Sequence, residues 1–197
     1  MKKVLASLCM AAGIAGFSGV AFAEGNGLYA AIDIGQLKAK DYCNTDGVAG
    51  ITVTSCDDTD TAYRLGLGYQ FNENFGLEAN YVDFGNAGGS GTYLGVPFTV
   101  NTDADAFQLA VTGALPLNES FALTGKIGAA RINADTSVSA LGIPLGSVSD
   151  NSTELTYGIG VRYNINKTMA IRAQYEDFGK IDDVDLTLLS VGMTFGF

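Results

Sequence analysis

The sequence contains no histidine and no tryptophan, and only three cysteines and three prolines among its 197 residues. Without histidine there is no imidazole to act as a catalytic base, and no other pairing of a nucleophile with a base stands out. We therefore expect no enzymatic activity, no catalytic residue, no cofactor and no metal site. Basic residues are also scarce, 11 against 21 acidic ones, and the formal net charge is −10 at pH 7. A chain this acidic is a poor partner for nucleic acid.

Long apolar runs are lacking except near the N-terminus. Two lysines precede an apolar stretch at residues 4–20, and a small-residue motif, Ala-Phe-Ala, ends at Ala23. This order predicts a cleaved secretory signal peptide over residues 1–23, followed by one mature domain over residues 24–197. The alternative is an uncleaved membrane helix, which the short apolar run and the adjacent cleavage site disfavour. No later stretch approaches the length of a transmembrane helix.

Two cysteines, Cys43 and Cys56, would remain after cleavage of the signal peptide. An exported protein meets an oxidising compartment, so we expect a Cys43–Cys56 disulfide. It would close a short loop and contribute about 3 kcal/mol to stability. A metal or redox role is less favoured, because no histidine could complete a site.

Eight segments alternate between apolar residues and small or polar residues with a period of two. They are residues 27–37, 62–71, 75–85, 106–115, 121–132, 154–164, 168–179 and 185–197. This alternation predicts strands whose two faces lie in different environments, and each segment is long enough to cross a bilayer when tilted. Tight turns are expected at residues 72–74, 116–119 and 164–167, and longer loops at residues 37–60, 86–105 and 133–153, with a shorter one at 180–184. We predict an all-β fold, an eight-stranded antiparallel up-and-down transmembrane β-barrel.

The composition of the two faces indicates which one points outward. Glycines such as Gly66 and Gly158 share a face with charged residues such as Glu78, while aromatic residues such as Tyr63 and Tyr69 lie near the ends of the apolar face. A small, charged face suits a narrow interior, and aromatic girdles suit the two membrane interfaces. The alternative, an apolar interior as in soluble ligand-binding barrels, is disfavoured.

Two sequence features carry a resemblance to a known family. Residues 63–85 align without gaps on residues 157–179 and share an Asp-Phe-Gly ending, and the chain closes on a strand of alternating residues that ends in Phe197. The closing strand resembles the C-terminal assembly signal of outer-membrane barrels. Residues 27–197 resemble the OmpA-like transmembrane domain, within the small opacity-type surface proteins. The resemblance implies a place in the bacterial outer membrane, contact with its lipids and lipopolysaccharide, and insertion by the barrel-assembly machinery.

Two charged residues at equivalent positions of the aligned repeats are the clearest candidates for an ion pair inside the barrel. Glu78 and Arg172 occupy equivalent repeat positions, on segments that face one another in a ring of eight. An eight-stranded barrel has room only for its own side chains, and an unpaired charge inside it is costly, so the two should pair. The resemblance implies the same, because the OmpA family pairs a carboxylate and an arginine on these strands.

The second ion pair of the OmpA family is not expected here, because Thr112 and Arg162 stand at the matching positions. We expect Arg162, Lys126 and Asp33 to complete a rearranged luminal network with the first pair. Such a network is either a gate on a narrow solute path or a plug that holds the barrel together, and the small interior favours the plug.

A repeated motif lies in two of the expected loops. Its pattern is Leu-Gly, then Val or Ile, then Pro and an apolar residue. The apolar members are Leu94, Val96, Phe98, Leu141, Ile143 and Leu145. Glycine and proline predict hairpin tips, and exposed apolar tips could grip a host or matrix surface or else pack on the barrel rim. We expect a structural, adhesin-like role at the cell surface. The alternative is a small passive pore, for ions through the lumen or for apolar molecules that leave laterally.

Overall fold

The computed structural model describes residues 27–40, 51–181 and 184–197. The predicted signal peptide and Cys43 lie outside the described residues. Within the described part of the chain, no helix is long and apolar enough to cross a membrane.

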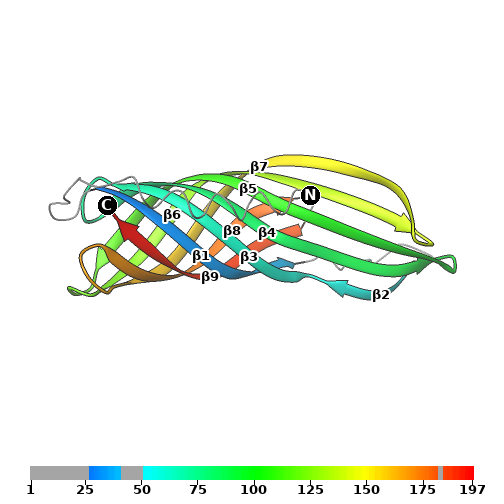
Figure 1. Ribbon diagram of the computed structural model, residues 1–197, viewed down its shortest axis with the longest axis horizontal. Coiled ribbons are helices and arrows are strands. Elements are labelled where there is room, and N and C mark those ends of the chain that lie inside the picture. Colours follow the sequence, from blue (N-terminus) through cyan, green and yellow to red (C-terminus); the bar gives the residue numbers. More distant parts are fainter. Residues whose placement is uncertain (1–26, 41–50, 182–183) are drawn as a thin grey trace.

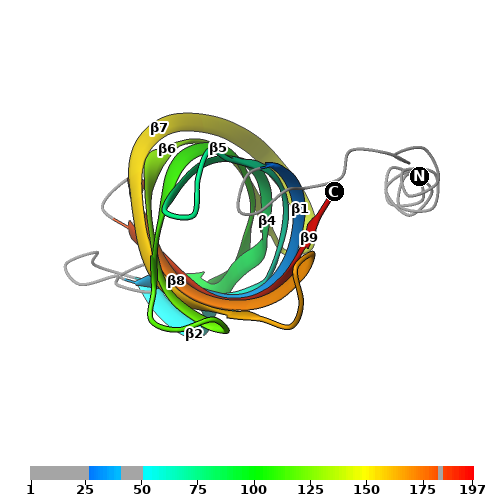
Figure 2. The same cartoon turned by 90° about the vertical axis from the view of Figure 1, so that its left-hand side faces the viewer.

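Nine strands make up the described structure. They are β1 (Gly27–Lys40), β2 (Ile51–Asp57), β3 (Thr59–Gln70), β4 (Phe75–Tyr93), β5 (Val96–Pro116), β6 (Phe121–Ala140), β7 (Ile143–Asn164), β8 (Met169–Ile181) and β9 (Val184–Gly196). The eight strands other than β2 pair antiparallel in chain order, from β1 with β3 to β8 with β9. The pairing of β1 with β9 closes the ring, which is seen end-on in Figure 2. The short β2 pairs with β4 outside that ring. The predicted eight-stranded antiparallel barrel is confirmed.

Side chains alternate between the lumen and the outside, as the sequence pattern predicted. On β3, Arg64 is buried inside the barrel, whereas Leu65 and Leu67 are exposed on its outer face. An outer band of this kind is stable only where acyl chains replace water around it. The middle of the barrel is therefore the part that spans the membrane.

Three asparagines shape the tight turns at one end, the end marked C in Figure 1. In each turn the side-chain oxygen of Asn72, Asn118 or Asn166 accepts hydrogen bonds from the backbone N–H groups two and three residues later, at 2.8–2.9 Å. An asparagine side chain satisfies a turn in this way without help from the rest of the fold. Short turns of this kind face the periplasm in outer-membrane barrels.

The opposite end differs from the expectation of long loops. Most of residues 86–105 and 133–153 is strand, because β4, β5, β6 and β7 run on past the ring as two long hairpins, here called the ribbons (Figure 1). Pairing continues to Tyr93 opposite Val96 and to Ala140 opposite Ile143. Both faces of a ribbon meet water, so its sequence lacks the apolar–polar contrast of a membrane strand. Threonine and valine still favour the extended backbone.

The Asp-Phe-Gly ending of each repeat forms the same β-bulge. Gly85 has a φ of 77° and Gly179 a φ of 81°, and the pairing register shifts directly at both places. The carboxylates of Asp83 and Asp177 accept hydrogen bonds from these glycine N–H groups at 2.9 and 2.8 Å. The positive φ explains why glycine follows the phenylalanine in both repeats.

Candidate functional site

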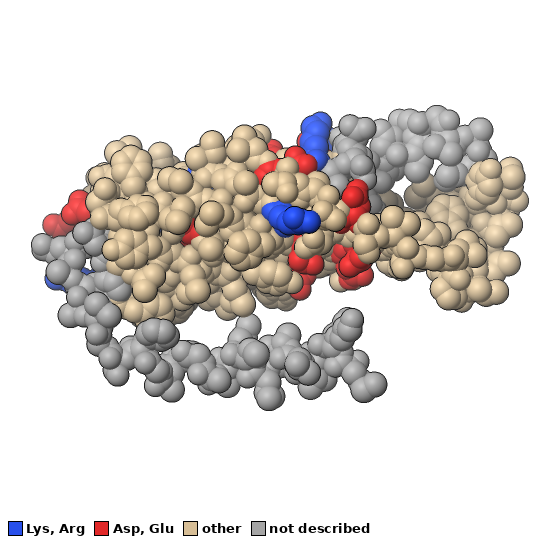
Figure 3. All heavy atoms as spheres, turned by 90° about the horizontal axis from the view of Figure 1, so that it is seen from above, with Lys and Arg blue, Asp and Glu red and all other residues tan. Residues whose placement is uncertain are grey.

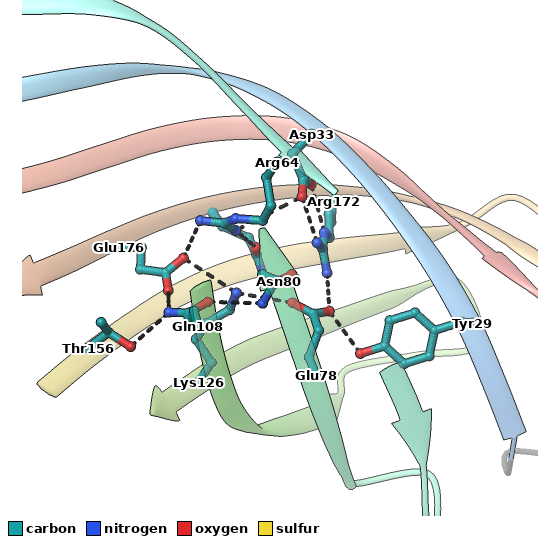
Figure 4. Close-up of polar contacts among 11 residues, drawn as sticks. Tyr29, Asp33, Arg64, Glu78, Asn80, Gln108, Lys126, Thr156, Arg172 and Glu176 are labelled. Atoms are coloured by element: carbon teal, nitrogen blue, oxygen red, sulfur yellow. Dashed lines mark hydrogen bonds and ion pairs between the residues drawn. The ribbon is translucent and has the colours of Figure 1, made fainter. Parts of the chain in front are cut away.

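Six charged side chains meet at mid-height in the lumen, and we call them the luminal charge network (Figure 4). Its members are Asp33, Arg64, Glu78, Lys126, Arg172 and Glu176. All six are buried, and they come from β1, β3, β4, β6 and β8. Three acids face three bases, so the network is neutral by itself.

Arg172 is the centre of one half of the network. Its Nε and Nη2 donate hydrogen bonds to the two carboxylate oxygens of Asp33 at 2.7 and 2.6 Å, and its Nη1 donates to Glu78 at 2.6 Å. Glu78 also accepts hydrogen bonds from the Tyr29 hydroxyl at 2.9 Å and from Lys126 Nζ at 3.2 Å. The arginine thus uses both edges of its planar guanidinium on two carboxylates, which a lysine could not do.

Glu176 is the centre of the other half. It accepts a hydrogen bond from Arg64 Nη2 at 2.5 Å and another from the Gln108 amide at 2.5 Å. Lys126 Nζ lies 3.4 Å from Glu176 and 3.2 Å from Glu78, so it joins the two halves. Charges this deep in a barrel are stable only when each is paired and hydrogen-bonded.

The structure brings together four of the five residues that the sequence proposed for this network: Asp33, Glu78, Lys126 and Arg172. Arg162 is the exception, because it makes no ion pair with any described residue and lies nearer the periplasmic end. Arg64 and Glu176 also belong to the network and were not predicted from the sequence. The sequence pattern that could have identified them is that each lies on the same face of its strand as the other inward-pointing residues. The repeat could not reveal them, because their repeat counterparts are uncharged.

An apolar layer, which the sequence pattern did not predict, fills the lumen on the outer side of the network. Its members are Leu37, Ala39, Ala62, Val82, Phe84, Ala106, Ala130, Ile132, Phe178, Leu186 and Leu188. The rings of Phe84 and Phe178, from the two repeats, meet edge to face at a centroid distance of 4.9 Å. Arg64 lies 5.9 Å from the centre of the Phe178 ring and so joins the polar and apolar layers.

The interior is therefore polar only in part, and this corrects the expectation of a wholly small and charged lumen. Where the strands leave the membrane, their outer face meets water instead of lipid. The same residues of each strand still point inward, but the polarity of the two faces is exchanged: Val82 and Phe84 are buried inside, while Asp83 between them is exposed outside. The rim is built like a soluble barrel, with an apolar inside and a polar outside.

The ribbons end in two matching turns. Leu94 and Gly95 have φ values of 49° and 83°, and Leu141 and Gly142 have φ values of 52° and 76°. Two consecutive residues with positive φ define the type I′ turn of a two-residue hairpin. Both leucine side chains are exposed, by 76% and 69%.

Five of the six apolar residues proposed from the repeated motif are exposed at these tips: Leu94, Val96, Leu141, Ile143 and Leu145. Phe98 is the exception, because its side chain is only partly exposed and its ring lies against Gly91. The tips therefore present an apolar surface to the outside instead of packing on the rim.

Charge is distributed unevenly between the ribbons and the barrel. Residues 87–102 and 136–149, which form the outer parts of the ribbons, contain no charged residue. Acidic side chains instead gather where the ribbons join the barrel, and in the view of Figure 3 the ribbon beyond them is uncharged. The tips are therefore apolar and uncharged, and the junction between the ribbons and the barrel is acidic.

Two further predictions from the sequence concern metal binding and the disulfide. In the described ranges, no group of three or more potential ligand side chains could hold a metal ion. Cys56 lies on β2 opposite Gly89. Because Cys43 lies outside the described residues, the Cys43–Cys56 disulfide stays a prediction.

Comparison with known families completes this picture. Residues 9–197 match the model of the outer membrane protein beta-barrel domain. The chain belongs to this family. The predicted location in the outer membrane is thereby confirmed. A search of curated protein sequences returned no match.

Solved structures of other outer-membrane barrels share this fold. Ail of Yersinia pestis, the attachment invasion locus protein, is 21% identical with a TM-score of 0.52, and the match covers 89% of this chain and 100% of that one. OprG of Pseudomonas aeruginosa is 16% identical with a TM-score of 0.56, over 88% and 98% of the two chains. The barrel domain of OprF from the same organism is 10% identical with a TM-score of 0.54, over 88% and 100%. At these identities the likeness shows the fold alone.

Proposed function

We propose that this outer-membrane barrel is a sealed scaffold that presents an adhesin-like, apolar contact surface at the tips of its ribbons. The observation that carries the proposal is the left-handed backbone of Leu94 and Leu141. A bulky residue in this conformation costs about 1–2 kcal/mol, whereas asparagine or glycine adopts it readily. Strain that recurs at equivalent exposed positions supports a role for the side chain, because folding alone would favour asparagine there.

The charge distribution supports a neutral, apolar target on a host cell or matrix. Ail has been solved in complex with sucrose octasulfate, a heparin analogue, which is a polyanion. The acidic residues at the base of the present ribbons, such as Asp103 and Asp135, would repel a polyanion. Apolar tips without charge fit an apolar surface better, since contact there removes leucine and isoleucine side chains from water.

The double variant Leu94→Asn/Leu141→Asn tests the proposal. Each substitution places an Asn-Gly pair in a type I′ turn, the pairing that such turns favour, so the barrel should fold as well as the wild type or slightly better. Adhesion of bacteria that display the variant to host cells or matrix should fall severalfold. Heat-modifiable migration on a gel checks folding.

A matched control removes apolar side chains from the opposite end of the barrel. Leu117 and Ile165, exposed by 64% and 47%, lie in the periplasmic turns. The variant Leu117→Asn/Ile165→Asn should leave adhesion unchanged. Equal adhesion of the tip variant and the wild type would refute the proposal.

The alternative function is a small passive pore. The plug is favoured because the lumen holds two filled layers in series, the neutral charge network and the apolar layer with its Phe84–Phe178 contact. We expect no channels from the purified protein in planar bilayers, and none from Arg172→Ala. Channels that appear only in Arg172→Ala would favour the gate, and channels in both proteins would favour the pore.

Membership in the family also bears on the partners of the barrel. The outer band of apolar side chains contacts membrane lipid. We further propose that the barrel contacts lipopolysaccharide in the outer leaflet and is inserted by the barrel-assembly machinery, as its closing strand indicated. Loss of insertion when that machinery is depleted would test the second point.

A further inference from the structure

The periplasmic half of the lumen differs from the rest of the interior. Its wall consists mainly of small or uncharged residues, among them Gly76, Thr112, Ala122, Thr124, Gly160 and Ala170. Gly76, Ala122, Thr124 and Ala170 lie on the inward face of strands that also carry members of the charge network, whereas Thr112 and Gly160 lie on β5 and β7 opposite residues of those strands. Tyr29 lies at the boundary: its ring lies over Gly68 on the neighbouring strand, and its hydroxyl donates a hydrogen bond to Glu78.

One charged residue, Arg162, points into this half among the residues that the structure describes. It is partly buried and makes no ion pair with a described residue. Its cross-strand neighbours are Ala122 and another cation, Arg172. The three acids of the charge network are already matched by three bases, so no carboxylate there is left over for Arg162. Its positive charge is therefore uncompensated within the described structure, which is costly in a confined interior.

Two polar atoms in this region lack hydrogen-bond partners. They are Arg162 Nε and Thr124 Oγ1, and both are enclosed by the surrounding structure. Thr124 lies opposite Gly160, with its hydroxyl oxygen 3.0 Å from the place where a Cβ on Gly160 would stand. Gly160 is two residues before Arg162 on the same face of β7. The threonine hydroxyl and the guanidinium therefore lie at neighbouring positions on one wall of the lumen.

We propose that the periplasmic half of the lumen binds a small oxyanion of the carboxylate or phosphate class, held by Arg162 and Thr124. A guanidinium donates paired hydrogen bonds that match the oxygens of these anions, and a threonine hydroxyl donates one more. The anion supplies the negative charge that the interior lacks at this level. Both residues are partly exposed, so a rotation of either side chain turns a polar atom that now lacks a partner toward the anion.

The burial pattern fixes the route of entry. Arg162 and Thr124 are partly exposed, whereas every member of the charge network is buried. The buried charge network fills the lumen above the site. A ligand therefore enters from the periplasmic mouth and stops at Arg162, without crossing the membrane.

Binding is tested with the whole protein in a detergent that carries no phosphate or carboxylate. Equilibrium dialysis with labelled inorganic phosphate, and separately with labelled acetate, measures affinity at constant chloride. The side-chain Nε–H signal of Arg162 in NMR reports the site. We expect saturable binding of one of the two anions and a saturable shift of that signal. Arg162→Gln should weaken binding at least tenfold, as the loss of a charge-assisted contact predicts.

Three further variants complete the test. Arg162→Lys retains the charge but loses the paired donors, and should bind more weakly than the wild type but better than Arg162→Gln. Lys167→Gln removes a cation from an exposed periplasmic turn outside the lumen and should bind like the wild type. If Arg162→Gln does not fold, Thr124→Val, which keeps the shape of the side chain, replaces it and should weaken binding severalfold.

The outcomes separate the sources of the anion. Saturable binding of free phosphate or acetate identifies a free ion as the ligand. A saturable shift with short-chain phosphatidic acid alone identifies a lipid headgroup and still supports an oxyanion site. The proposal is overturned if neither anion nor the lipid binds saturably. It is also overturned if loss of Arg162 and loss of Lys167 have equal effects, which would indicate general attraction to positive charge.

Discussion

Removing Arg172 from the charge network gives a prediction whose size follows from the structure. Arg172→Met takes away three charge-assisted hydrogen bonds and leaves Asp33, Glu78 and Glu176 facing two bases, Arg64 and Lys126. Leaving one buried charge without its partner costs about 3–5 kcal/mol. We expect the free energy of unfolding of Arg172→Met to fall by about that amount.

A second substitution should restore much of the loss. Asp33→Asn in the same chain removes the acid that depended most on Arg172 and leaves two acids against two bases. The remaining contacts, Arg64 to Glu176 at 2.5 Å and Lys126 to Glu78 at 3.2 Å, do not involve either changed residue. The double variant should therefore be more stable than the sum of the two single losses by about 2–3 kcal/mol.

Urea unfolding of the barrel in phospholipid vesicles measures all four proteins of this cycle. The control combines Asp33→Asn with Arg131→Met, which removes an exposed cation outside the lumen, and it should show no such recovery. If the losses from Arg172→Met and Asp33→Asn simply add, the two residues are not coupled and the idea of a neutral, mutually paired network is refuted.

Two more predictions concern the packing of the lumen. Phe178→Ala should lower the free energy of unfolding by about 3–5 kcal/mol, because it leaves a cavity beside Phe84. The double variant with Phe84→Ala should lose less stability than the sum of the two single losses. Additive losses in urea unfolding would contradict the observed ring contact. Gly68→Ala should lower the free energy of unfolding by about 1–3 kcal/mol, because the new Cβ would clash with the Tyr29 ring and force it away from Glu78. The control, Gly113→Ala, should be nearly neutral, because the nearest neighbouring atom would be 3.9 Å from its Cβ. Equal effects of the two glycine substitutions on the melting temperature would argue against the placement of Tyr29.

Much of the barrel could be predicted from local patterns. A period of two over membrane-length segments indicates strands, and the contrast between glycine or charge on one face and aliphatic residues on the other indicates which face meets lipid. The pairing of Glu78 with Arg172 was predictable for the same reason, since their positions in the repeats place them on facing strands. The ribbons were missed because both of their faces meet water, and without a second environment the alternation carries little contrast.

The sequence by itself determined the strand segments that cross the membrane, the outward apolar face and the hairpin turns, because these depend on alternation and on single residues such as Asn72. Only the closed tertiary structure decided that Arg64 and Glu176 join the network and that Arg162 stands apart from it. Its strand order also brought Phe84 and Phe178, 94 positions apart in the sequence, into contact inside the rim. These contacts depend on the distances between inward-facing side chains across the lumen, and the closed ring sets those distances.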